Sequence, residues 1–92
     1  MPLERRRVVY SGRVQGVGFR ATCRWLAGGF DVAGYVRNLA DGRVELLAEG
    51  DPAEIDGLLQ AVQNEMGGFI RESTSDREQP DDPPLVGFTV RF

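Results

Sequence analysis

The chain has 92 residues, and its 11 arginines against 14 acidic residues give a net charge of −3. A duplex-binding domain normally needs a basic excess, because neutralising phosphates drives its affinity, so this balance does not favour a nucleic-acid partner. The sequence contains neither histidine nor lysine. These absences exclude a histidine-activated nucleophile, a zinc site of the usual histidine and cysteine type, and a P-loop that depends on lysine.

The length of the chain and its single cysteine limit the architectures that are possible. The 92 residues suffice for one domain, expected over 1–92, and the 41% hydrophobic content is in the normal globular range. Cys23 is the only cysteine, so no disulfide can form within the chain, which fits a reducing compartment. No signal peptide follows the basic start, and no apolar run approaches membrane-spanning length. We therefore expect a cytoplasmic protein that does not bind a membrane.

The first half of the chain predicts one helix among three strands. Alternating apolar residues predict strands at residues 6–11, 32–39 and 43–49. A helix is expected from Phe19, where the apolar spacing becomes helical, to Gly28-Gly29, which end it. The last two strands are joined by a tight turn at 40–42, because Asp-Gly suits the positive φ that such turns demand.

The second half begins with the clearest helix of the sequence. Asp51 is a good N-cap and Pro52 suits the first helical position. An apolar stripe at helical spacing follows, made of Ile55, Leu58, Leu59, Val62 and Met66. Residues 69–77 predict a weak, polar strand, 79–84 a loop, and 85–92 a closing strand.

This order of elements is typical of an α+β fold, the ferredoxin-like sandwich. Its βαββαβ pattern, here with a short C-terminal strand added, places two helices on one face of an antiparallel sheet. Many unrelated functions use this fold, so the site must decide the function.

The segment from Gly12 to Arg20 carries the strongest chemical signal. It runs from a strand end to a helix start, where unpaired backbone N–H groups and a partial positive charge favour a phosphate. Gly16 and Gly18 permit the unusual backbone angles of an anion-binding nest. The planar guanidinium of Arg20 can make two parallel charge-assisted bonds to the same phosphate.

The same loop also allows two other readings. It could be a plain glycine-rich turn with a surface arginine. Residues 16–21 match the dinucleotide pattern G-x-G-x-x-A, but that fold needs an acidic residue ending a second strand about 20 residues on. Asp41 has roughly this separation but lies in the predicted turn, and the chain is too short for the larger parallel sheet.

Asn38 ends the second predicted strand and is the other candidate. By strand alternation it shares a face with Gly34 and Val36, so an amide stands where an apolar residue would be expected. The side chain could cap its own turn. Alternatively, its carbonyl oxygen could accept a hydrogen bond from a water molecule and orient that water for attack.

Together the two segments resemble the acylphosphatase family. Residues 12–20 (GRVQGVGFR) match its signature G-x-V-Q-G-V-x-F-R, and residues 34–44 (GYVRNLADGRV) match its segment G-x-V-x-N-x-x-D-G-x-V. The spacing of the motifs, the chain length and the order of elements also agree, so the resemblance spans nearly the whole chain.

The resemblance implies hydrolysis of the carboxyl-phosphate anhydride of acyl phosphates, with no metal and no other cofactor. It implies that Arg20 is the catalytic phosphate-binding residue and that Asn38 orients the water. The phosphate would be cradled by main-chain N–H groups of Gln15, Gly16, Val17, Gly18, Phe19 and Arg20. Inorganic phosphate or sulfate would then compete with the small-molecule substrate, and the family resemblance suggests a monomer.

Water would attack the phosphorus in line, and the carboxylate would leave without a general acid. The water would lose its proton to a phosphate oxygen, so no histidine is required. The alternative is a non-catalytic anion-binding or regulatory module, including a domain cut from a larger carbamoyl-phosphate-handling protein. A nucleic-acid-binding ferredoxin-like domain comes third.

Four further expectations concern three single positions and one polar stretch. Gly18 replaces a residue that is often bulky in the family, which favours a looser loop or a wider pocket. The polar stretch 72–77 favours a short or mobile fourth strand. On the first helix, Cys23 is expected in the core, and Trp25 is expected to pack fully or half beside it.

Overall fold

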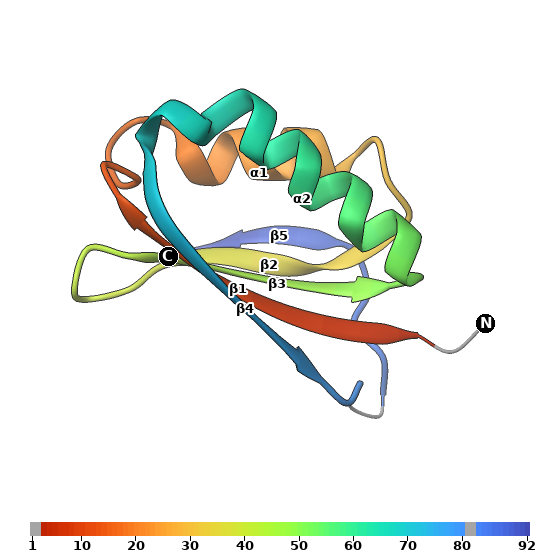
Figure 1. The fold of residues 1–92 in the computed structure, drawn as a ribbon. Coiled ribbons are helices and arrows are strands. Elements are labelled where there is room, and N and C mark those ends of the chain that lie inside the picture. Colours follow the sequence, from red (N-terminus) through yellow and green to blue (C-terminus); the bar gives the residue numbers. More distant parts are fainter. Residues whose placement is uncertain (1–2, 81–82) are drawn as a thin grey trace.

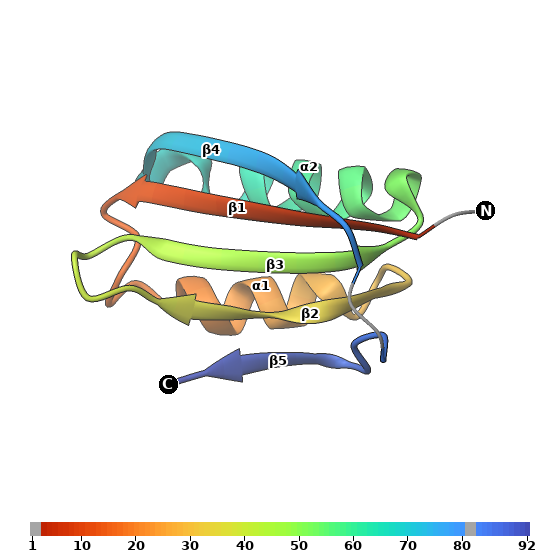
Figure 2. The same ribbon diagram turned by 90° about the horizontal axis from the view of Figure 1, so that it is seen from below.

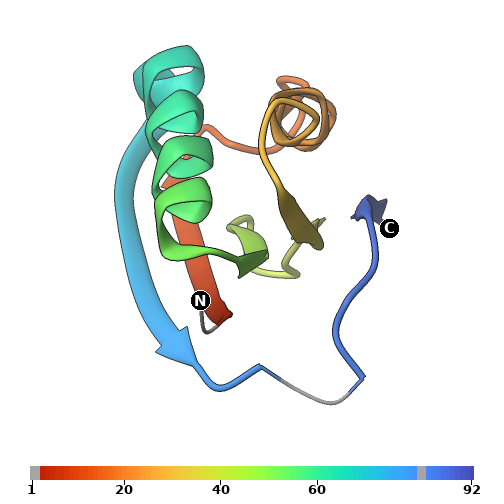
Figure 3. The same cartoon turned by 90° about the vertical axis from the view of Figure 1, so that its right-hand side faces the viewer.

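The computed structural model describes residues 3–80 and 83–92, so the middle of the predicted loop at 79–84 lies outside the described residues. The elements in chain order are β1 (Glu4–Gly12), α1 (Phe19–Ala27), β2 (Val32–Asn38), β3 (Val44–Gly50), α2 (Pro52–Met66), the short 3-10 helix η1 (Gly67–Phe69), β4 (Ile70–Glu78) and β5 (Phe88–Arg91). Both α-helices cover the same face of one sheet (Figures 1 and 3). Neither has the length and apolar character needed to cross a bilayer. The predicted ferredoxin-like sandwich is confirmed.

The strands lie in the order β4-β1-β3-β2-β5, which Figure 2 shows from the face without helices. The four strands of the βαββαβ unit form antiparallel pairs, as predicted, whereas β5 pairs with β2 in parallel. The parallel pairing follows from the chain path. β5 runs back from the end of β4, and β2 also runs opposite to β4, so β5 and β2 point the same way. The sheet as a whole is therefore mixed.

The fourth strand is longer than its composition suggested. β4 has nine residues and pairs with β1 from Arg5↔Glu78 to Gly12↔Ile70, although residues 71–77 are exposed. The expectation of a short strand was wrong because backbone hydrogen bonding along a neighbour, rather than burial of side chains, defines this edge. The position of β4 matters for function because β4 pairs with the end of β1, and the glycine-rich loop begins at that end.

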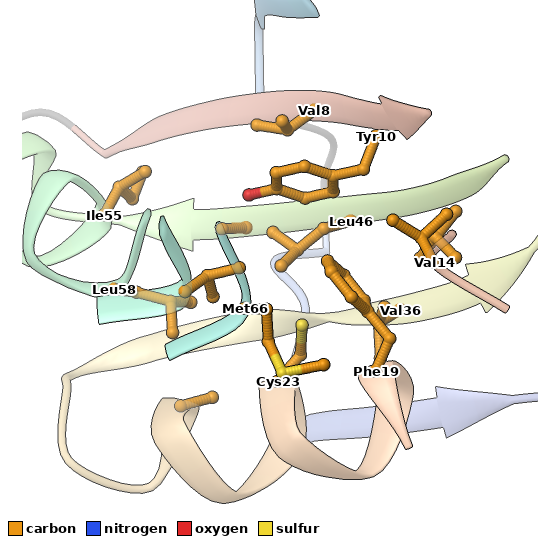
Figure 4. Packing of buried hydrophobic residues seen from close by; sticks show 14 residues of the cluster. Val8, Tyr10, Val14, Phe19, Cys23, Val36, Leu46, Ile55, Leu58 and Met66 are labelled. Carbon is orange, nitrogen blue, oxygen red and sulfur yellow. The ribbon is translucent and has the colours of Figure 1, made fainter. Parts of the chain in front are cut away.

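One hydrophobic core lies between the helices and the sheet (Figure 4). The fully buried side chains include Phe19 and Cys23 of α1, Leu46 of β3, and Ile55 and Leu58 of α2. Each large apolar side chain buried in this way contributes roughly 1.5–3 kcal/mol relative to leaving it in water. The predicted apolar stripe of α2 and the core position of Cys23 are confirmed. Burial raises the pKa of the Cys23 thiol to about 12, so this cysteine stays protonated at neutral pH.

The opposite face of the sheet carries a network of charged side chains. Glu45 of β3 is almost fully buried there and accepts hydrogen bonds from Arg7, from Arg37 at 2.7 Å and from the hydroxyl of Tyr35 at 3.1 Å. Farther along the same strand, Glu49 accepts a bond of 2.8 Å from Arg5. Removing either partner of such a buried pair is costly, since the remaining charge loses its compensation.

Candidate active site

The glycine-rich loop leaves the sheet at a defined point. At the end of β1 the pairing with β4 shifts register between Ser11 and Gly12, and the N–H of Arg13 donates a bond of 2.9 Å to the carbonyl of Phe69. Gly12 has φ +123°, and a Cβ there would lie 2.5 Å from that same carbonyl oxygen. Only glycine permits so close a backbone approach. Two residues on, the side chain of Val14 is 1% exposed and anchors the loop in the core.

Two glycines shape the rest of the loop. Gly16 and Gly18 both adopt φ +78°, in the left-handed region that glycine enters without strain. Gly18 is also the N-cap of α1, so it supplies no capping side chain, and the first turn of the helix carries no acidic residue. The positive end of the helix dipole is therefore left uncompensated by the protein at this point.

The backbone N–H groups of residues 15–20 are a second feature of this loop that favours an anion. Within residues 3–80 and 83–92, none of these six donors has a hydrogen-bond acceptor from the protein. Unpaired backbone donors at a loop and helix start are the usual construction of an anion site. The structure therefore supports the loop as an anion-binding element rather than a plain turn.

Gln15 ties this loop to the hairpin that follows Asn38. Its Nε2 atom donates to the carbonyl oxygens of Leu39, at 2.9 Å, and of Arg43, at 3.0 Å. The turn between β2 and β3 forms where it was predicted, with the N–H of Leu39 donating to the carbonyl of Arg43 at 2.8 Å. The two sequence motifs are thus held together by one side chain, whose part in this the sequence did not reveal.

Arg20 lies in the first turn of α1, directly after Phe19, which is 2% exposed and packs on the ring of Tyr10 at a centroid distance of 5.2 Å. Its Nη1 atom donates to the carbonyl of Arg91 at 2.9 Å, and its guanidinium carbon lies 4.8 Å from the centre of the Phe92 ring. Among the described residues these are the contacts that hold the guanidinium. One of its five N–H donors is used, and the others can bind an anion.

Asn38 is half-buried at the end of β2 and borders the same cavity as Gly16, Gly18 and Arg20. Its side chain makes no hydrogen bond within the described part of the chain. The adjacent turn is closed instead by Asp41, whose carboxylate accepts from the N–H of Arg43 at 3.1 Å and from its Nε at 2.7 Å. The hydrogen bond from the backbone N–H of Arg43 is the largest cause that holds the pKa of the Asp41 carboxyl below its ordinary value. Asn38 therefore does not cap its own turn, and its amide is available to a water molecule.

Arg20 and Asn38 border one cavity of about 880 Å³. The cavity lies between the loop, α1 and β5, and its lining residues are Val14, Gly16, Gly18, Phe19, Arg20, Ala21, Arg24, Trp25, Gly28, Asn38, Thr89, Val90 and Phe92. Four of the six residues whose N–H groups were predicted to hold phosphate are in this set. Gln15 and Val17 do not border the cavity.

Two features of the site were not visible in the sequence. Arg91, at the end of β5, and Phe92, directly after it, contact Arg20, and no local pattern connects residue 20 with residue 91. Trp25 is 75% exposed and lines the cavity, so the expectation that it packs beside Cys23 was wrong. It lies five positions after Arg20, about 140° around the helix axis, so the spacing of these two residues did not signal that they line one cavity.

Comparison with known proteins gives a consistent answer. The sequence model of the acylphosphatase family matches residues 6–90. An acylphosphatase of Synechococcus sp. is 44% identical over 80 residues, 87% of this chain and 84% of that protein. One of Haloarcula marismortui is 43% identical over 90 residues, 96% of each chain. The crystal structure of the Bacillus subtilis acylphosphatase superposes with a TM-score of 0.85 at 32% identity, covering 98% of this chain and 99% of that one. The chain therefore belongs to the acylphosphatase family, and it is a hydrolase with acylphosphatase activity rather than a non-catalytic anion-binding module.

Proposed function

We propose that the chain hydrolyses the carboxyl-phosphate anhydride of small acyl phosphates at the cavity between the glycine-rich loop and β5. The observation that carries this proposal is that Arg20 and Asn38 border that cavity together with Gly16, Gly18 and Phe19, whose backbone N–H groups have no acceptor among the described residues. We further propose that residues 1–92 act as a single domain and a monomer in the cytoplasm, without a nucleic-acid partner.

Phosphate binding is the first step. The N–H groups of the loop surround the equatorial oxygens, and the guanidinium of Arg20 forms two parallel bonds to them. Charge builds up on these oxygens in the transition state, so donors fixed beforehand stabilise it without reorganisation. The contacts of Arg20 with Arg91 and Phe92 support this role, because they hold the guanidinium before the substrate arrives.

Attack by water is the second step. The carbonyl oxygen of Asn38 accepts a hydrogen bond from the water and places it in line with the scissile bond. A new bond forms between the water oxygen and phosphorus, while the bond from phosphorus to the acyl oxygen breaks. The acyl group leaves as a carboxylate, and the proton of the water passes to a phosphate oxygen. The products are the carboxylate and orthophosphate, and no protein group need donate or accept a proton.

The test is an assay of the purified chain on benzoyl, acetyl and carbamoyl phosphates, with orthophosphate release as the readout. We expect turnover of at least one of them, inhibited competitively by inorganic phosphate or sulfate. Binding of inorganic phosphate without turnover of any acyl phosphate would instead indicate an anion-binding module. A salt-sensitive shift of RNA by the chain would indicate the nucleic-acid-binding alternative.

A further inference from the structure

The cavity is much larger than the phosphate that the loop would hold. Its volume of about 880 Å³ lies in the range of roughly 300–1,000 Å³ that accommodates a whole drug-sized ligand. On α1 and its C-cap, Gly28, the lining residues recur at helical spacing, as Arg20, Ala21, Arg24, Trp25 and Gly28. At 1.5 Å per residue, this face extends about 12 Å along the helix away from Arg20. The cavity therefore continues from the anion site as a groove between α1 and β5.

Trp25 is the distinctive side chain of this groove. It is 75% exposed, and within the described residues its indole makes no ring contact and no cation–π contact. Small residues lie beside it on the same helix face, Ala21 one turn before and Gly28 nearly one turn after, so a flat ligand can approach the indole. An exposed indole that lines a cavity is an unused apolar binding surface.

We propose that the groove is the acyl subsite and that Trp25 selects a planar, apolar acyl group by stacking on it. This inference rests on the proposed function, since the phosphate at Arg20 fixes where the acyl group begins. The anhydride places the acyl carbon one oxygen away from phosphorus, so a short acyl group stays near the loop. An aromatic acyl group extends along the groove toward Trp25, with Val90 of β5 on the opposite side.

A competing occupant is an acyl group with a second negative charge. Arg24 also lines the groove and has no ion-pair partner among the described residues, so it could bind a distal carboxylate. The exposed indole favours the apolar group. An exposed guanidinium is well hydrated and gains little free energy from an ion pair, whereas covering the apolar surface of an indole is favourable. The experiment distinguishes the two.

The first measurement compares kcat/KM for benzoyl and acetyl phosphate in the wild type and in Trp25→Ala. We expect the benzoyl-to-acetyl ratio to fall by about three- to tenfold, the effect of losing one aromatic pair. Trp25→Phe should restore most of the ratio. Val86→Ala is the matched control, since Val86 is also apolar and 92% exposed but does not line the groove. A ratio unchanged in Trp25→Ala would overturn the proposal, and so would a marked preference for succinyl phosphate that is lost in Arg24→Ala.

The second measurement does not depend on turnover. Trp25 is the only tryptophan in the chain, so its fluorescence reports directly on the groove. The probes are phosphonate analogues with a methylene group in place of the bridging oxygen, one with a benzoyl group and one with an acetyl group. We expect the benzoyl probe to shift or quench the emission and the acetyl probe to change it little. Equal responses to both would overturn the subsite. If both probes bind as expected but no acyl phosphate is turned over, the proposed function fails while the subsite stands.

Discussion

The Nη1 atom of Arg20 donates a hydrogen bond of 2.9 Å to the carbonyl oxygen of Arg91, which joins the first turn of α1 to the end of β5. The side chain of Arg91 lies on the other face of the sheet, where its guanidinium stacks 3.8 Å from the centre of the Tyr35 ring. The hydroxyl of Tyr35 in turn donates to the buried carboxylate of Glu45. The orientation of Arg20 therefore depends on a strand end that is held from the opposite side of the sheet.

Arg91→Ala should lower kcat by about three- to tenfold, with a smaller change in KM. The carbonyl that accepts from Arg20 remains in the backbone, but the stack that fixes it is lost, and such contacts contribute about 0.5–2 kcal/mol. Arg91→Lys keeps a cation over Tyr35 and should recover part of the loss. Arg71→Ala, at the far edge of the sheet, serves as the control. Unchanged kinetics in Arg91→Ala would show that Arg20 needs no support from β5.

Arg20→Ala should reduce kcat/KM for benzoyl phosphate by at least about a hundredfold, because removing one fixed donor to a charged transition state costs roughly 2.7–4 kcal/mol. Arg20→Lys should fail to restore the activity, since a point charge cannot make the two parallel bonds. Circular dichroism and the denaturation midpoint should match the wild type. Activity within tenfold of the wild type in Arg20→Ala would remove this residue from the mechanism.

Asn38→Ala should lower kcat by about ten- to hundredfold and leave KM for benzoyl phosphate nearly constant, because the side chain acts on the water rather than on the phosphate. Asn64→Ala is the matched control, since Asn64 is an exposed asparagine of α2 whose side chain bonds to Gln60. A rise in KM with constant kcat would instead make Asn38 a substrate-binding residue.

Glu45→Gln should destabilise the protein at pH 7 and flatten the dependence of its stability on pH. Burial works against the charged form of Glu45, but hydrogen bonds from Arg37, Arg7 and Tyr35 outweigh it and hold its pKa below the ordinary value. A lowered pKa in the folded state stabilises the fold above the unfolded pKa of about 4.3, and this contribution is lost as the pH falls further.

Urea unfolding between pH 7 and pH 3 measures this contribution. The free energy of unfolding of the wild type should fall below about pH 5, whereas that of Glu45→Gln should start roughly 3 kcal/mol lower and fall less. Parallel curves for the two proteins would place the acid sensitivity elsewhere.

EDTA should leave the hydrolysis of benzoyl phosphate unchanged, and added Mg²⁺ should not raise it. In the proposed mechanism the guanidinium of Arg20 and the loop N–H groups supply the positive charge that a metal ion provides in other phosphoryl transfers. Initial rates before and after dialysis against the chelator are the measurement. A loss of activity that Mg²⁺ restores would contradict this assignment of charge.

The sequence predicted the elements well because their signals are local. Asp51 accepts a hydrogen bond from the N–H of Ala53 as a side-chain cap should, and Pro52 begins α2. The turn at 40–42 forms with Gly42 at φ +94°. The hydrophobic spacing of both helices likewise matches their buried faces. The extent of β4 was misjudged because its partner strand, rather than its own residues, decides where it pairs.

The candidate site likewise has parts that local sequence signals predicted and parts that they did not. Gly16, Gly18 and Arg20 lie within five positions, so the sequence by itself determined that a loop of backbone donors and a guanidinium meet at a helix start. Arg91, the side-chain bonds of Gln15 and the exposure of Trp25 were decided only in three dimensions. Those contacts depend on how α1 packs against β5 and on how the β2–β3 hairpin packs against the glycine-rich loop. Such packing joins residues far apart in the chain, for which a periodic pattern carries no signal.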